Sequence, residues 1–284
     1  MKRQILGISR STKYSPNSEN RDAAIFAAVA SRLNRGENEV SLISEDLFIA
    51  VDLSEFDLVF SMARGREVLK SLSLAETENL LKVVNSPTSL LTLSRANIVR
   101  NFQQNEIPIP RCEVVSLENV GNLEIAFPYW LKRADACAQN SNDVCFIENK
   151  EQLVSAITAF TEQGTATIVA EAHLKGDLIK FYGVEGTDFF SFSYPTDDGG
   201  FSKFGLEQKN GKPNYFVFDQ NKLKMLADKA AKSIGLTIYG GDAIVQADGS
   251  IRFIDFNDWP SFSSCRKEAA RAIANRINQI LHKS

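Results

Sequence analysis

The stretch 240–257 constrains the fold of this chain more than any other, because two apolar runs there flank Asp248-Gly249. That dipeptide is the strongest short-range signal for a hairpin with a two-residue turn. Counting outward from such a turn places Asp242 directly opposite Asp255. Residues opposite one another project from the same face of a sheet, so the sequence predicts two carboxylates side by side.

The predicted carboxylate pair is unfavourable unless a cation accompanies it. At about 5 Å and an effective dielectric near 20, two such charges repel by roughly 3 kcal/mol, whereas favourable cross-strand pairs return only about 0.2–1 kcal/mol. Asn257 lies two residues beyond Asp255 and faces Gly240, which has no side chain. Oxygen ligands of this kind suit Mg²⁺ or Mn²⁺. We therefore predict a metal site at Asp242, Asp255 and Asn257; the alternative is a solvated Asp at a strand end, or a slipped register.

The composition excludes several classes of protein. The chain has 284 residues, of which 44% are hydrophobic and 24% charged, and a net charge of −3. With no block of Lys and Arg, neither nucleic acid nor an anionic membrane is expected as a partner. The N-terminal apolar run is too short for a signal peptide, and no segment is long enough to cross a bilayer. The four cysteines form no Cys-x-x-Cys pair. The sequence therefore predicts a cytoplasmic protein with free thiols.

Strand and helix signals alternate through the first hundred residues, as in βαβ units. A stiff Ile107-Pro108-Ile109-Pro110 segment suggests a first boundary. We predict a Rossmann-like domain with its connecting helix over 1–106, a small α+β lobe over 107–184 and a C-terminal lobe over 185–284. The expected strands and helices of the first domain are Ile5–Ile8, Asp22–Leu33, Glu39–Ile43, Leu58–Phe60, Lys82–Val84 and Thr88–Gln104. Those of the other two lobes are Phe127–Lys132, Glu151–Phe160, Thr165–Ala170, Leu178–Val184, Asn214–Phe218, Gln220–Ile234 and Cys265–Leu281, besides the hairpin.

Common nucleotide and hydrolase motifs are absent from the sequence. There is no Gly-x-x-x-x-Gly-Lys run, no Gly-x-Gly-x-x-Gly after the first strand and no His-Glu-x-x-His. Two lysines, Lys132 and Lys180, instead lie inside apolar strands. Each alone fits an edge or snorkelling residue. Beside an acidic metal site, they become candidates for neutralising polyphosphate oxygens.

The order of these features along the chain resembles that of ATP-grasp enzymes: Lys132, Glu171 at a strand end, Lys180, Asp242, then Asp255-Phe256-Asn257-Asp258-Trp259-Pro260. The last run is similar to the metal motif of D-alanine–D-alanine ligases, ribosomal-protein glutamate ligases and ATP-grasp inositol polyphosphate kinases. The resemblance covers nearly the whole chain. It implies a mixed α/β and α+β architecture: an ATP-grasp fold with an N-terminal Rossmann-like preATP-grasp domain, a lid lobe and a C-terminal lobe.

The resemblance also implies ligands and residue roles. ATP and Mg²⁺ (or Mn²⁺) would be the cofactors, with Lys132 and Lys180 on the ATP phosphates. The adenine-side hinge would be formed by Glu171, Ala172, His173 and Leu174. The Mg²⁺ ions that bridge the phosphates would be held by Asp242, Asp255 and Asn257.

This chain departs from the family pattern at three places. The loop 133–143 contains no glycine where many relatives are glycine-rich, so its backbone wraps phosphates less easily, and Gln139, Asn140 or Ser141 are candidates to substitute. Position 255 is Asp where the compared ligases have Glu. Arg95 stands where several relatives carry an ATP-contacting lysine.

The leading functional hypothesis is an ATP-dependent ligase that converts a carboxylate into an acylphosphate for attack by an amine or similar nucleophile. Arg64, Arg66 and Arg266 are the candidates for holding the carboxylate, because arginine binds it bidentately; each also fits a surface residue. The alternatives are a kinase acting on a small alcohol or polyol phosphate, and a nucleotide-binding protein without turnover, which the glycine-free loop favours. The expected partners are small-molecule substrates, and the sequence leaves a homodimer open.

Overall fold

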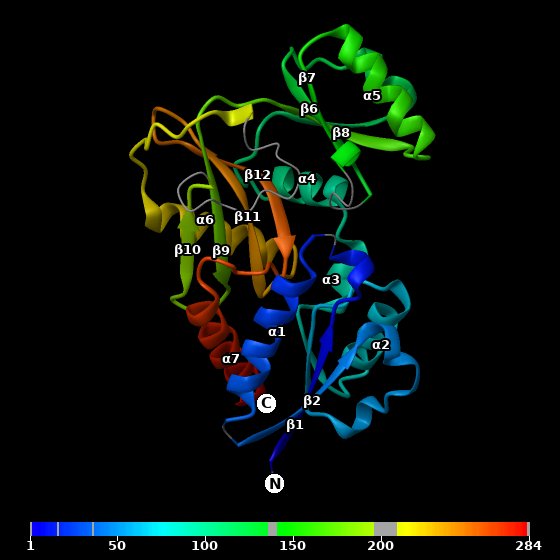
Figure 1. Cartoon of the computed structure of the whole chain (residues 1–284), viewed down its shortest axis with the longest axis vertical. Coiled ribbons are helices and arrows are strands. Elements are labelled where there is room, and N and C mark those ends of the chain that lie inside the picture. The colour runs from blue at the N-terminus through cyan, green and yellow to red at the C-terminus, as the bar shows by residue number, and fades with distance from the viewer. Residues whose placement is uncertain (1, 16, 36, 136–140, 196–208, 283–284) are drawn as a thin grey trace.

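The structure, a computed structural model, describes residues 2–15, 17–35, 37–135, 141–195 and 209–282. Its strands form three four-stranded sheets. Figure 1 shows the first sheet at the bottom of the molecule, the second at the top and the third between them. The mixed α/β and α+β architecture therefore agrees with the sequence analysis. Short 3₁₀ helices lie at Thr12–Tyr14, Glu45–Ala50, Leu53–Glu55, Leu117–Asn122 and Ser141–Asp143.

The first sheet is parallel throughout, in the order β2-β1-β3-β4, as βαβ units predict. The strand predictions for this region are confirmed, whereas α2 was not predicted. The elements of this sheet are β1 (Arg3–Ser9), α1 (Glu19–Leu33), β2 (Asn38–Ser44), β3 (Leu58–Ser61), α2 (Arg66–Thr77) and β4 (Lys82–Val84).

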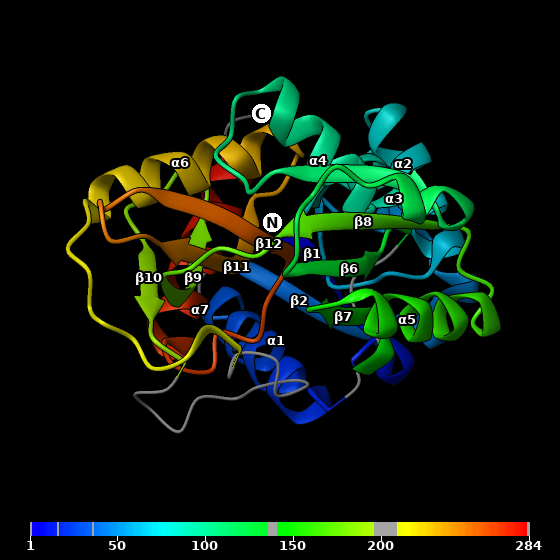
Figure 2. The ribbon, with the colours of Figure 1, turned by 90° about the horizontal axis from the view of Figure 1, so that it is seen from above.

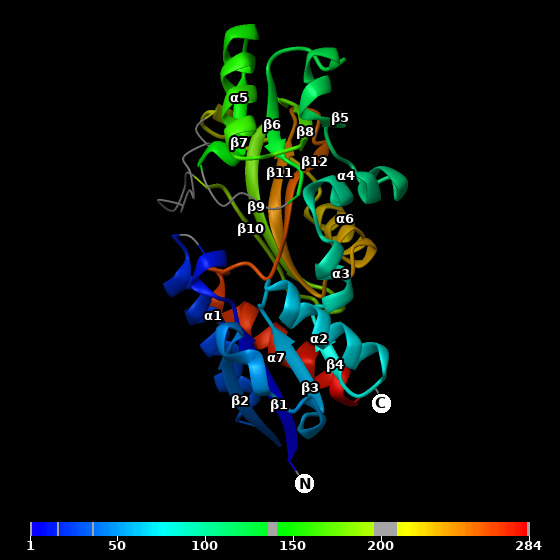
Figure 3. The same cartoon turned by 90° about the vertical axis from the view of Figure 1, so that its right-hand side faces the viewer.

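The last helix of the chain, α7 (Arg266–His282), returns to this first sheet. Its buried residues Ile273 and Ile277 share one apolar core with Ile25 and Val29 of α1. Figure 3 shows α7 beside α1, below the third sheet. No helix within the described residues is both long and apolar enough to cross a membrane.

The predicted connecting helix 88–104 is two helices, α3 (Pro87–Thr92) and α4 (Arg95–Gln104). Leu93 leaves the helical conformation, with φ −75° and ψ 87°. The Ser94 side chain then accepts a hydrogen bond from Asn97 N and caps the second helix. This break matters because it places Arg95 at the first turn of α4.

The second sheet is antiparallel, in the order β5-β8-β6-β7, and α5 (Lys150–Glu162) covers one of its faces. Leu131 and Ala170 point into the core that includes Phe160 of α5. Because side chains alternate along a strand, Lys132 and Glu171 lie on the opposite face. The strands are β5 (Cys112–Ser116), β6 (Tyr129–Arg133), β7 (Val144–Ile147) and β8 (Thr167–Ala172); β5 and β7 were not predicted.

The third sheet is also antiparallel, in the order β10-β9-β11-β12, with α6 (Gln220–Ser233) on one face (Figure 2). Its strands are β9 (Asp177–Val184), β10 (Phe190–Ser193), β11 (Ile238–Val245) and β12 (Ile251–Asp258). We expected β9 to close the middle lobe, but it pairs with β11, so the change of sheet falls before Asp177. The division into domains itself stays a prediction.

The expected strand at 214–218 is an irregular segment that joins none of the described sheets, and Tyr215 within it adopts φ +57°. The buried carboxylate of Asp177 accepts hydrogen bonds from Asn214 N (2.6 Å), Asn214 Nδ2 (3.2 Å) and Phe216 N (2.8 Å). These bonds satisfy backbone donors that a neighbouring strand would otherwise take up.

The β11–β12 hairpin confirms the predicted pairing of Asp242 with Asp255, but not the predicted turn. Gln246 pairs with Ser250, so the turn has three residues and Gly249 adopts φ +76°. The longer turn shifts the register by one residue. A bulge between Asp242 and Ala243 shifts it back, because Ile254 is an extra residue on β12. The two offsets cancel, and the carboxylates face one another.

Candidate functional site

A row of four polar residues crosses one face of the third sheet. Ser193 pairs with Lys180, Lys180 with Asp242, and Asp242 with Asp255, one residue from each of the four strands. We call these four residues the polar row. Lys180 Nζ lies 3.2 Å from Asp242 Oδ1 and 3.4 Å from Oδ2. The row thus brings a predicted phosphate contact and two predicted metal ligands together.

Asp255 lies between an amide and a guanidinium. Asn257 Nδ2 donates to Asp255 Oδ2 over 3.0 Å, and Arg95 NH2 lies 4.0 Å from Asp255 Oδ1. Burial acts to raise the pKa of Asp255, but Arg95 and Lys132 outweigh it, so the pKa lies below its ordinary value. Asp255 is therefore held ionised, as a metal ligand must be.

Lys132 reaches the same region from the second sheet. Its Nζ donates to Glu171 Oε1 (2.7 Å) and to the carbonyl of Ile254 (2.9 Å), the extra residue of the bulge. Lys132 and Glu171 are both buried. Burial raises the pKa of Glu171, and Lys132 offsets part of that rise. The bulge therefore supplies a carbonyl that fixes the position of a predicted phosphate-binding lysine.

A second row of residues lies beside the polar row, two residues further along each strand. It consists of Ser191, Tyr182, Gly240 and Asn257. A Cβ at Gly240 would lie 2.8 Å from Cγ of Pro260, so the proline ring occupies the space above the glycine. Burial raises the pKa of Tyr182 to about 12, which keeps its hydroxyl a hydrogen-bond donor.

The predicted metal ligands fit a divalent cation by their chemistry. Asp242, Asp255 and Asn257 present carboxylate and amide oxygens at adjacent register positions, the donors that Mg²⁺ and Mn²⁺ prefer. Within the described residues, no three His, Cys, Asp or Glu side chains gather as a metal-binding group. The site would therefore depend on two carboxylates, one amide and further oxygens from a ligand such as a phosphate.

The predicted hinge, 171–174, ends β8 beside this site. Ala172 N donates to Arg111 O and His173 N to Pro128 O, so the protein itself uses both N–H groups. The Glu171 side chain points to Lys132, and His173 Nδ1 accepts a hydrogen bond from Trp130 Nε1 over 3.2 Å. If the backbone of this segment binds the adenine base, the contacts would therefore be made by its carbonyl groups or by Leu174.

A largely apolar cavity opens between α4 and β12, next to the polar row. Arg95, Glu171 and Asp255 are its charged lining residues. The remaining lining residues are Ile98, Val99, Phe102, Ile109, Cys112, Phe253, Ile254 and Phe256. Ordinary ligand sites have this character, an apolar wall with a few convergent polar groups.

The three candidate arginines lie in different surroundings. Arg64 NH2 forms an ion pair with Asp258 at the end of β12. Arg66 is the exposed first residue of α2. Arg266 is the first residue of α7, and its buried Nε has no hydrogen-bond partner within the described residues.

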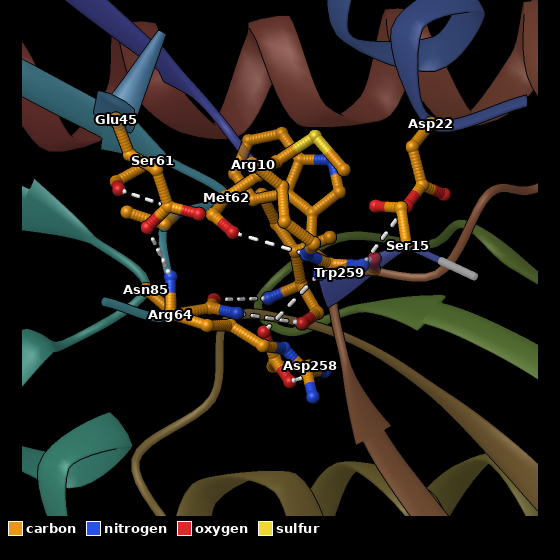
Figure 4. Close-up of polar contacts among 12 residues, drawn as sticks. Arg10, Ser15, Asp22, Glu45, Ser61, Met62, Arg64, Asn85, Asp258 and Trp259 are labelled. Atoms are coloured by element: carbon orange, nitrogen blue, oxygen red, sulfur yellow. Dashed lines mark hydrogen bonds and ion pairs between the residues drawn. The ribbon is translucent and has the colours of Figure 1, made fainter. Parts of the chain in front are cut away.

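Sequence reasoning missed a buried cluster that joins the first sheet to β12 (Figure 4). Arg10 donates to Asp22 Oδ2 (3.0 Å), Asp258 Oδ2 (3.5 Å), Met62 O (3.1 Å) and Trp259 O (3.3 Å). Asp258 thus receives both Arg10 and Arg64. The only signals were that Arg10 directly follows the first strand and that Asp258 belongs to the metal motif.

A second missed residue is Glu45, a buried carboxylate at the carboxyl end of β2. It accepts hydrogen bonds from the backbone N–H groups of Ser11, Arg64 and Gly65. These donors follow β1 and β3, where open parallel sheets commonly bind ligands. The protein's own carboxylate fills that position, which agrees with the absence of a dinucleotide motif.

The glycine-free loop is only partly described. Residues 136–140, among them Gln139 and Asn140, lie outside the described residues, as does the Ser141 side chain. Arg133 pairs with Asp135 (2.7 Å) and with Asp143 (3.5 Å), one on each side of that gap. The role predicted for this loop stays untested.

No known protein-family model and no curated protein matches the chain. Solved structures do. A RimK domain protein ATP-grasp from Sphaerobacter thermophilus is 15% identical, with 95% of this chain and 98% of that one covered and a TM-score of 0.65. The VanG D-Ala:D-Ser ligase from Enterococcus faecalis is 14% identical, with 99% and 100% covered and a TM-score of 0.69. The D-alanine–D-alanine ligase from Bacillus anthracis, in complex with ATP, is 13% identical, with 100% and 99% covered and a TM-score of 0.64.

The chain therefore has the ATP-grasp fold along its whole length, as predicted, whereas the Rossmann-like character of the N-terminal domain stays a prediction. At identities of 15% or less, the likeness establishes the fold, and the reaction has to be argued from the site.

Proposed function

We propose that this protein is an ATP-dependent ligase that activates a substrate carboxylate as an acylphosphate, which an amine or similar nucleophile then attacks. One observation supports this most: the polar row of the third sheet and Lys132 of the second sheet converge on the same region of an ATP-grasp fold. Two of the similar structures are ligases that join D-amino acids.

The proposed chemistry is mainly positioning and charge neutralisation. Lys132 and Lys180 would neutralise the phosphate oxygens of ATP, and the γ-phosphoryl group would pass to a carboxylate oxygen of the acid. Mg²⁺ or Mn²⁺, held by Asp242, Asp255 and Asn257, would supply Lewis-acid stabilisation of the phosphate charge. Of the three arginines, Arg266 has a buried Nε with no hydrogen-bond partner among the described residues, and Arg64 forms an ion pair with Asp258 at the end of the metal strand.

The first test is calorimetric titration of ATP, with and without Mg²⁺, into wild-type protein and Asp255→Asn. We expect metal-dependent binding that the substitution weakens by at least about tenfold, because an amide oxygen lacks the negative charge with which the carboxylate attracts a divalent cation. If the wild type does not bind ATP, the proposal is wrong. Asp242 and Asp255 would then be interpreted as solvated strand residues.

Turnover separates the remaining alternatives. Carboxylic acids are screened with Mg·ATP and hydroxylamine, which traps an acylphosphate as a hydroxamate. A ligase releases ADP and phosphate and forms a hydroxamate with a particular acid. A kinase instead forms a stable phosphorylated product from an alcohol and needs no amine. Binding of Mg·ATP without turnover on any acid or alcohol would mark a regulatory protein.

A further inference from the structure

The polar row places a lysine directly against one of the two carboxylates that are predicted to bind metal. Lys180 Nζ lies within 3.4 Å of both carboxylate oxygens of Asp242, and these side chains are 21% and 25% exposed. Carboxylates that bind metals are usually hydrogen-bonded by neighbouring groups as well. Here the neighbouring group is an ammonium, and it contacts both of the Asp242 oxygens that a metal ion would bind.

The neighbouring charged residues are also paired with residues of opposite charge. Arg95 NH2 lies 4.0 Å from Asp255 Oδ1, and Lys132 forms the ion pair with Glu171. Around this part of the described structure there are thus three cationic and three acidic side chains: Lys132, Lys180 and Arg95, with Glu171, Asp242 and Asp255. The charges of these six described side chains sum to zero.

A partly buried group of side chains whose charges balance disfavours any ligand that brings a large net charge. A divalent cation alone would add two positive charges next to Lys180, and a bare nucleoside triphosphate would add about four negative charges next to two carboxylates. A metal-bound triphosphate adds much less net charge. It also gives Lys180 a new anionic partner when the metal takes the oxygens of Asp242.

On the basis of the proposed function, we infer that Lys180 is a positioning residue that changes partners. It pairs with Asp242 until a metal-bound triphosphate arrives and then pairs with phosphate, so that metal and nucleotide bind only together. Lys180 thereby prevents the site from taking up a divalent cation alone.

The test uses Lys180→Met, which keeps the length of the side chain and removes its charge. Binding of Mn²⁺ alone, of ATP alone and of Mg·ATP is measured by calorimetry, with Mn²⁺ also followed by electron paramagnetic resonance. The wild type is expected to bind Mg·ATP and to bind Mn²⁺ alone weakly. In Lys180→Met, affinity for Mn²⁺ alone rises by about tenfold or more, and affinity for Mg·ATP falls by about tenfold.

Two further variants serve as controls. Lys180→Arg keeps the charge and is expected to exclude Mn²⁺ as the wild type does. Lys229→Met removes an exposed lysine of α6 and is expected to change neither affinity. Thermal melting of every variant identifies a loss of fold, and if Lys180→Met does not fold, Lys180→Gln, which also removes the charge, is compared with the wild type.

The outcomes distinguish this inference from the proposed function. If the wild type binds no Mg·ATP, the proposed function fails. If it binds Mg·ATP and also binds Mn²⁺ alone with comparable affinity, the inference is overturned. The inference is likewise overturned if Lys180→Met leaves Mn²⁺ affinity unchanged while it remains folded.

Discussion

At the scale of single residues, Arg10 is a buried cation that compensates the charges of two buried carboxylates. Its side chain is 8% exposed, and those of its partners Asp22 and Asp258 are 9% and 4% exposed. Removing one member of a buried ion pair leaves an uncompensated charge in the interior. Arg10 therefore matters for stability even though no part of the proposed chemistry uses it.

We expect Arg10→Met to lower the free energy of unfolding by about 3–5 kcal/mol, measured by urea denaturation. The matched control is Arg3→Met, which breaks the pair with Asp57 at 48% and 32% exposure. An exposed pair of this kind contributes about 0–1 kcal/mol. Equal losses in the two variants would contradict the role assigned to Arg10.

Asp255 provides a prediction of pH dependence. Its pKa in the folded protein lies below the ordinary value, because Arg95 and Lys132 outweigh burial. Folding therefore favours the ionised form, and the resulting stability is present above about pH 4 and lost as the pH falls through the lower folded pKa. The difference in unfolding free energy between the wild type and Asp255→Asn should shrink between pH 7 and pH 2.5. A difference that is constant over this range would show that ionised Asp255 does not stabilise the fold.

At the scale of elements, the β11–β12 hairpin shows which structural features local sequence signals predict and which they miss. Asp248-Gly249 correctly predicts the place of the turn, and the alternation of side chains predicts the facing carboxylates. The extra turn residue and the bulge at Ile254 were not predictable, because both depend on contacts made elsewhere: Ile254 O binds Lys132 of another sheet. Local signals also missed β10, a four-residue strand whose pairing with β9 defines it.

The conformation of Gly249 in this turn leads to a prediction about stability. Its φ is +76°, and a Cβ there would lie 2.9 Å from Val217 O. Gly249→Ala is expected to destabilise the protein by about 1–2 kcal/mol from the left-handed conformation alone, and further from this contact. Gly164→Ala is the control, since Gly164 has φ +69° and open space around it. Urea denaturation should show the larger loss at Gly249; an equal loss would mean that Val217 yields without cost.

At the scale of the whole molecule, the three sheets are held together by contacts between residues far apart in the chain. Asn85, after β4, accepts hydrogen bonds from Thr237 N and Ile238 N and donates one to Ile238 O, where β11 begins, and Arg10 donates to Asp258. The order of the motifs predicted the fold and brought Lys180, Asp242 and Asp255 together. It could not predict Arg10 or Glu45, because nothing in a single sequence indicates which distant residue a buried charge will meet.

The return of α7 to the first sheet leads to the last prediction. Ile273 is fully buried in the core that includes Ile5 of β1 and Ile25 of α1, so Ile273→Ala should cost about 2–5 kcal/mol. If α7, α1 and the first sheet open as one cooperative unit, amide exchange should accelerate in β1 and α1 while β8 stays protected. Val154→Ala on α5, where the side chain is 63% exposed, should leave both regions unchanged. Faster exchange in all three sheets would instead show that the C-terminal helix stabilises the molecule as a single unit.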